Sequence, residues 1–194
     1  MKLDNNDKLI QVLLVGNEKD IILSTSKGKC VRFSTDDVRV FSGRTSMGVR
    51  GIKLQNNDRI ISASVLNSID INTDEREEYL KYSSAIRRKE KRKVSIDKNR
   101  LNTIQDKEEF LLSVTENGFG KRTEVSKYRL TSRGGKGVTT LKITDKTGLI
   151  VNAFQTENED DIVLLSSAGK ATRLKTSDIS IIGRATQGVK IIKL

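Results

Sequence analysis

The chain has 194 residues, 35% of them hydrophobic and 31% charged, which is the composition of a folded rather than a disordered protein. Its 36 lysines and arginines exceed its 25 acidic residues and give a net charge of +11, which favours a polyanionic partner. There is no histidine and only one cysteine, Cys30, which argues against Ser-His or Cys-His catalysis, thiolate metal cages and disulfides.

The first predicted element is a β-hairpin over residues 20–33, with its turn at Gly28. In its second strand, Val31 and Phe33 alternate with Cys30 and Arg32, so we expect Cys30 to be a small buried hydrophobe rather than a nucleophile. A glycine-containing segment follows over residues 44–54. A third strand begins after Asp58.

Residues 67–106 form an insertion. Residues 75–93 lack glycine and proline, so a helix is expected there, ending in a basic run over residues 87–93. The insertion holds 10 basic and 8 acidic residues, which is +2 of the total +11, so most of the net charge lies outside it. A basic run of this kind is more often a solvated, partly disordered extension than a specific DNA contact.

The same elements then return twice. Hairpins recur over residues 110–123 and 161–174, and glycine segments over residues 133–143 and 184–194. Lys2 to Lys53 is 51 residues, Lys142 to Lys193 is 51, and Lys53 to Lys142 is 89, or 51 plus 38. The single 194-residue domain therefore divides into three units, at about residues 2–52, 53–141 and 142–194.

Units of this length with several short strands are typical of propeller blades. We therefore predict an all-β, propeller-like repeat of four-stranded blades with one helical or disordered insertion. Apolar spacing of three and four residues does not persist, and β-branched residues are abundant in the strands, which disfavours a helical solenoid.

Basic residues recur at fixed places in the repeat and form the candidate DNA-binding site. Equal placement on every blade would produce a curved stripe of charge that contacts phosphates and bends duplex DNA without reading its bases. The candidates are Arg32, Arg44, Arg50, Lys121, Arg122, Arg133, Lys136, Lys170, Arg173, Arg184 and Lys190. The alternative is that the repeated arginines pair with acids such as Asp36, Asp37 and Asp178 and tie blade to blade.

The segment Arg133, Gly134, Gly135, Lys136, Gly137 is the most suggestive local motif. Glycines let backbone N–H groups approach an anion closely, and the flanking cations add charge. It lacks the spacing of a nucleotide-binding P-loop, and no residue cluster points to a metal or a cofactor.

Taken together, the motifs Gly-Lys-x-x-Arg-Phe, Thr-x-Gly-Val-Arg-Gly-Ile-Lys-Leu and Gly-Arg-x-Thr-Gln-Gly-Val resemble the C-terminal domain of bacterial DNA gyrase A. Here they stand at residues 28–33, 45–54 with one further residue after the threonine, and 183–189. The resemblance implies a β-pinwheel whose blades exchange strands and whose basic rim wraps DNA in support of ATP-driven negative supercoiling. Two departures are the presence of only three units, against about six in the family, and a degenerate Gly-rich box that starts at Thr131-Ser132 instead of Gln-basic.

The resemblance implies a non-catalytic, sequence-independent DNA module of a bacterial, cytoplasmic, nucleoid-associated type IIA topoisomerase. Its expected partners are double-stranded DNA and the remainder of gyrase A together with gyrase B, with no membrane. A homodimer through open edge blades is a further expectation. Two alternatives stay open, namely the DNA-selecting C-terminal domain of topoisomerase IV and a truncated protein-interaction propeller without DNA activity.

Overall fold

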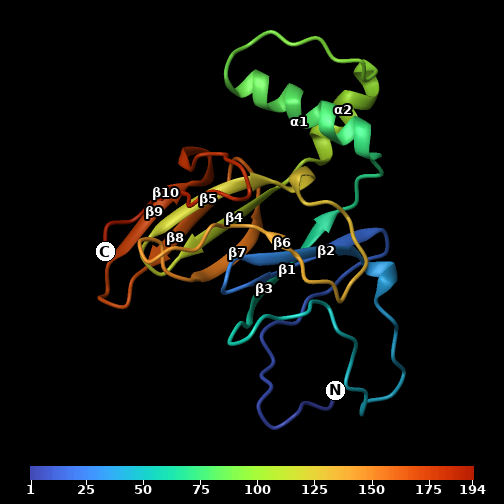
Figure 1. Ribbon diagram of the computed structural model, residues 1–194, viewed down its shortest axis with the longest axis vertical. Helices are drawn as coiled ribbons and strands as arrows, with labels where there is room; N and C mark the ends of the chain where they lie inside the picture. Colours follow the sequence, from blue (N-terminus) through green and yellow to red (C-terminus); the bar gives the residue numbers. More distant parts are fainter.

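A computed structural model describes all 194 residues. Its strands form three antiparallel β-sheets that are arranged as blades (Figure 1). Across the first blade, the strands are β3 (Ile60–Asn67), β1 (Lys19–Thr25), β2 (Lys29–Ser34) and β6 (Val138–Thr139). Across the second, they are β10 (Val189–Lys190), β5 (Phe119–Glu124), β4 (Phe110–Thr115) and β7 (Ile150–Thr156). The third holds only the hairpin β8 (Asp161–Leu165) and β9 (Ala171–Lys175).

Each complete blade is a hairpin of one unit closed on both sides by strands of the next unit. The second unit supplies β3, which pairs with β1, and β6, in which Val138 lies opposite Cys30 of β2. The third unit supplies β7 and β10 to the second blade in the same way. This arrangement confirms the predicted propeller-like repeat of four-stranded blades.

Short 3-10 helices follow the second strand of each hairpin and lead into the glycine segments. They are η1 (Thr35–Asp37), η2 (Val125–Lys127) and η3 (Thr176–Asp178). The glycines at the hairpin turns are required by close approach as well as by conformation. Gly28 and Gly118 have φ of +79° and +73°, and a Cβ on either would collide with a carbonyl oxygen, that of Leu141 or Ile192, from the next unit.

The main core lies between the first two blades. Ile22, Cys30 and Leu66 of the first blade pack with Leu111 and Ile150 of the second in one buried cluster. Burial of such side chains is the dominant stabilising contribution, at about 1.5–3 kcal/mol for each large aliphatic group. Cys30 is fully buried, as predicted, and burial raises the pKa of its thiol to about 12.

The insertion folds as a helical hairpin that stands off the sheets (Figure 1). Helix α1 (Thr73–Arg87) begins with a capping box between Asn72 and Glu75, and α2 (Lys98–Lys107) is capped by Asp97. Of the two predicted forms, the structure therefore shows the helical one. The helix that was predicted over residues 75–93 ends earlier, at Arg87. The second helix, α2, was not predicted.

Glu124 attaches the insertion to the second blade. Its buried carboxylate accepts hydrogen bonds from Arg87 (2.5 Å) and Lys127 (2.9 Å), so α1 and η2 share one anion. Tyr79, Leu101 and Ile104 form a small core of the insertion's own. None of the helices in this structure has the length and apolar character needed to cross a membrane.

Candidate nucleic-acid interface

The repeated hairpin arginine of the first blade is buried. Arg32 pairs with Asp20 (2.6 Å) and donates Nη1 to the carbonyl oxygens of Val125 (3.2 Å) and Tyr128 (3.3 Å) in the next unit. The side chains of Arg32 and Asp20 are 5% and 1% exposed. Because its guanidinium is enclosed by the protein, the prediction that Arg32 contacts DNA is not supported.

Arg122 occupies the same position in the second blade and is also buried. It donates Nε to the carbonyl of Ile179 (2.9 Å) and Nη1 to Asn158 Oδ1 (2.7 Å), and its guanidinium lies 5.1 Å from the Phe110 ring centre. Burial lowers the pKa of this guanidinium. The predicted DNA role is not supported here either. The alternative that these arginines tie blade to blade fits better, through carbonyl oxygens of the next unit rather than through ion pairs with Asp36, Asp37 or Asp178.

Arg173 is the third member of the set, and its side chain is 73% exposed. It pairs with Asp161, which stands 12 residues earlier as Asp20 does before Arg32. The hydrogen bonds of its guanidinium go to Asp161, and no carbonyl oxygen accepts one from it. Its exposure therefore follows from the open third blade.

Lys121 is fully buried, contrary to the site prediction. Its Nζ donates to the carbonyl oxygens of Gly183 (2.6 Å) and Arg184 (2.5 Å) and to Thr186 Oγ1 (3.0 Å), so it holds the glycine loop of the third unit. Burial, together with the charges of Lys127 and Arg184, lowers the pKa of Lys121 to about 7. An enclosed ammonium cannot reach a phosphate.

The glycine-loop arginines lie where successive units stack. Arg133 donates Nε to the carbonyl of Asp37 (2.8 Å) and Nη1 to that of Arg50 (3.2 Å). Arg184 makes the equivalent of the second contact, because its Nη1 donates to the carbonyl oxygen of Thr139 (3.5 Å), the residue that corresponds to Arg50 in the repeat. Both side chains stay partly exposed, whereas Arg44, the equivalent residue of the first unit, is exposed.

The Gly-rich segment is used partly for this stacking. The N–H of Gly134 donates to the carbonyl of Gly51 (2.6 Å), and the N–H of Lys53 donates to that of Gly135 (2.8 Å). The N–H of Lys142 donates to Thr186 (3.0 Å) in the corresponding place of the next unit. The Gly134 amide is thus not free to bind an anion, while Lys136 remains exposed.

Exposed cations follow this chain of hydrogen-bonded outer segments. We call them the outer cation strip; its members are Arg50, Lys53, Lys136, Lys142, Lys190 and Lys193. Lys53, Lys142 and Lys193 share one repeat position and were not among the predicted contacts. Their spacing of 89 and 51 residues was the signal that could have identified them.

Two further predicted contacts lie near the turns of the hairpins and are exposed. Lys190 donates Nζ to the carbonyl of Asn117 (2.6 Å) and lies 5.1 Å from the Phe119 ring centre. Lys170 donates to the carbonyl of Lys193. No group of three or more acidic or cysteine side chains lies close enough together to hold a metal ion.

Comparison with known families decides the relationship. A family model described as DNA gyrase C-terminal domain, beta-propeller, matches residues 19–67, 109–157 and 160–194, each of which contains one of the three hairpins. The chain belongs to this family. Similar curated proteins include the A subunit of DNA gyrase from Rickettsia bellii, 38% identical over 203 residues, and from Haemophilus influenzae, 37% identical over 194 residues. All of this chain is covered, but only 22% and 21% of those relatives, so it spans about a fifth of their length.

Solved structures show the same fold. The crystal structure of the C-terminal domain of DNA topoisomerase IV superposes with a TM-score of 0.74 at 19% identity, over 99% of this chain and 48% of that one. The E. coli ParC C-terminal domain gives 0.57 at 12% identity, over 97% and 62%. At these identities the likeness concerns the fold alone.

Proposed function

We propose that the chain is a duplex DNA-binding module of gyrase A that bends or wraps DNA and supports negative supercoiling. The observation that carries the proposal is the outer cation strip, in which one exposed lysine position recurs with the period of the repeat, at Lys53, Lys142 and Lys193. Flexible lysines on an exposed backbone can neutralise phosphates but do not read base edges, so binding is independent of sequence.

Stacking of the units gives the strip a curved course. Each glycine loop is hydrogen-bonded to the outer segment of the preceding unit, through Arg133 and then Arg184, so the cations follow the rotation from blade to blade. A duplex held along such a path is bent, and the phosphate contacts offset the cost of bending. The breakage and ATP-dependent steps belong, in this proposal, to the remainder of gyrase A and to gyrase B in the bacterial cytoplasm.

A salt series on two unrelated duplexes tests the binding. The variant Lys53→Gln/Lys142→Gln/Lys193→Gln should lower the slope of log affinity against log salt by about 0.9 for each lost phosphate contact, equally for both duplexes. A matched variant, Lys81→Gln/Lys98→Gln/Lys107→Gln, removes three exposed lysines of α1 and α2 and should leave the slope unchanged. Absence of wild-type binding even at low salt would favour a protein-interaction module instead.

Wrapping is measured separately from binding. Nicked circular DNA sealed in the presence of the protein should show a linking-number shift of one sign that grows with the amount of bound protein. DNA binding without any shift would refute wrapping and leave a simple DNA-binding module.

A further inference from the structure

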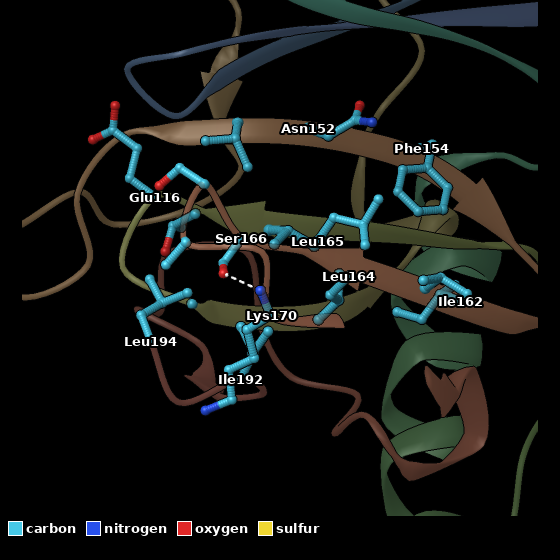
Figure 2. A pocket seen from close by; sticks show the side chains of 17 residues that line it. Glu116, Asn152, Phe154, Ile162, Leu164, Leu165, Ser166, Lys170, Ile192 and Leu194 are labelled. Atoms are coloured by element: carbon cyan, nitrogen blue, oxygen red, sulfur yellow. Dashed lines mark hydrogen bonds between the residues drawn. The ribbon is translucent and has the colours of Figure 1, made fainter. Parts of the chain in front are cut away.

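Two hollows in the surface differ in the chemistry of their walls. A groove of about 630 Å³ beside β8 is lined mostly by apolar side chains such as Phe154 and Leu164 (Figure 2). Its charged side chains are Glu116 and Lys170, one of each sign. A smaller pocket of about 280 Å³ lies where the start of the insertion meets the segment after η2, and three arginines line it. We call this second hollow the junction pocket.

Three parts of the chain build the junction pocket. Residues 68–73, which lead from β3 into α1, form one wall together with Arg76 in the first turn of the helix. Residues 128–130, which follow η2, form another wall. Arg32 of β2 also lines the pocket, but its charge is neutralised by the buried pair with Asp20. The pocket therefore exists only because the insertion packs against the second blade.

Arg76 brings a guanidinium group without a counterion to this pocket. It stands one turn before Tyr79, on the side of α1 that packs into the core of the insertion, and its Nε is buried without a hydrogen-bond partner. None of the ion pairs in the structure includes Arg76. An unsatisfied buried donor on a charged group is costly, and proteins seldom keep one without a reason. An anionic acceptor in the pocket would satisfy it.

Arg129 brings a second guanidinium group that has no counterion. Its side chain is exposed, and it too belongs to none of the ion pairs. Asp70 is the one acidic residue on the walls. Arg100 of α2 donates to the carbonyl oxygen of Asp70 and sets a positive charge beside its carboxylate. The uncompensated charge of the junction pocket is therefore that of Arg76 and Arg129.

Arg129 connects the junction pocket with the outer cation strip. It also lines a neighbouring pocket of about 350 Å³, whose walls include Lys136 and the glycines of the Gly-rich segment. Lys136 is a member of the strip. Cations thus continue from the strip at Lys136 through Arg129 to Arg76 on the insertion, and a phosphate backbone that lies on the strip passes beside this branch.

We propose that Arg76 and Arg129 together bind a phosphate group of the duplex, so that the insertion takes part in DNA binding. This inference rests on the proposed function and adds a site to it. Guanidinium groups suit the role, because their planar forks donate paired hydrogen bonds to phosphate oxygens. The contact fixes the path of the backbone and reads no bases. The basic run over residues 87–93, at the other end of α1, does not belong to the site.

A salt series on duplex DNA tests the contact. Arg76→Gln/Arg129→Gln should lower the slope of log affinity against log salt by about 0.9, the value for one phosphate contact, with an unchanged circular dichroism spectrum. The matched control Arg88→Gln/Arg92→Gln removes the same charge from exposed arginines beyond the end of α1 and should keep the wild-type slope. Arg76→Lys/Arg129→Lys retains both charges and should restore the slope, which separates loss of the contact from loss of folding.

Photocrosslinking locates the phosphate contact while both arginines stay in place. An azidophenacyl group attached to Ser68→Cys, on the wall of the junction pocket, should crosslink to the duplex. The same group on Asn102→Cys, exposed on α2 and outside the pocket, should crosslink much less. The native Cys30 is buried and stays unlabelled.

The results distinguish a failure of this site from a failure of the proposed function. A wild-type protein that binds no duplex even at low salt would overturn both. A wild-type protein that binds DNA with a slope that Arg76→Gln/Arg129→Gln leaves unchanged would overturn the junction site and leave the outer cation strip as the binding surface. A crosslinking yield at position 68 no higher than at position 102 would equally exclude the insertion from the DNA path.

Discussion

The guanidinium group of Arg32 in the first blade lies 3.3 Å from the backbone carbonyl oxygen of Tyr128 in the second unit. Arg122 reaches Ile179, the equivalent residue of the third unit, at 2.9 Å. In the first two hairpins, the recurring arginine is thus a link between neighbouring units.

Removing this link should be costly where it is buried. Arg32→Met leaves the Asp20 carboxylate buried without its cation, so we expect the free energy of unfolding to fall by about 3–5 kcal/mol. Arg173→Met breaks the equivalent pair at the surface and should cost about 0–1 kcal/mol. Urea unfolding measures both, and equal losses would contradict the linking role.

The hairpin glycines provide a second matched pair. Gly169→Ala introduces strain at φ +78° in open space, which should cost about 1 kcal/mol. Gly118→Ala adds a collision with Ile192, so we expect a loss larger by at least about 1 kcal/mol, measured by thermal unfolding at low protein concentration. Similar losses at the two sites would show that the close approach is unimportant.

The insertion should detach when Arg87 is removed. Burial would raise the pKa of Glu124, but hydrogen bonds from Arg87, Ser83 and Lys127 outweigh it and hold that pKa below its ordinary value. Arg87→Ala should destabilise the protein by about 1–3 kcal/mol and speed amide exchange in α1 more than in the sheets. Arg88→Ala, which breaks an exposed pair with Glu90, is the control and should change neither. The share of stability contributed by Glu124 is present above the ordinary pKa of a glutamate and is lost as the pH falls through its lowered value.

Lys121 predicts a pH dependence of the same sign in a higher pH range. Its pKa is about 7 in the folded protein and returns to about 10.5 on unfolding, so unfolding takes up a proton between these values and stability rises with pH. Between pH 7 and 8.5 we expect the gain to be on the order of 2 kcal/mol. The difference between wild type and Lys121→Met in urea titrations isolates this contribution. A difference that does not vary with pH would mean that Lys121 stays charged.

The repeat and the blade architecture could be predicted because the glycine offsets recur at a constant period. Burial could not be read from strand alternation, since both faces of β2 are covered: Val31 and Phe33 are buried, and so are Cys30 and Arg32. The acid that pairs with Arg32 stands in the opposite strand of the same hairpin. The predicted partners, Asp36, Asp37 and Asp178, instead follow the arginines in the chain.

The site was predicted only in part for a related reason. Lys121 corresponds in the repeat to Val31, an apolar strand residue that is buried. Alignment of the units therefore predicts that the side chain of Lys121 points inward. The exposed lysines at positions 53, 142 and 193 recur with the period of the repeat, but no local sequence motif marks them as binding residues. The second helix of the insertion depends on its packing against Tyr79, which residue spacing alone does not reveal.

The exchange of strands between units also delays the completion of the first blade while the chain is being synthesised. The first blade begins at Lys19 but cannot be finished until Val138 and Thr139 are available, roughly 120 residues later. At about 5–20 residues per second, a ribosome needs on the order of ten seconds to deliver them. During that interval the edge of β2 that later pairs with β6 is unpaired. The helical insertion, which folds around its own small core, lengthens the interval because it lies between β2 and β6 in the chain.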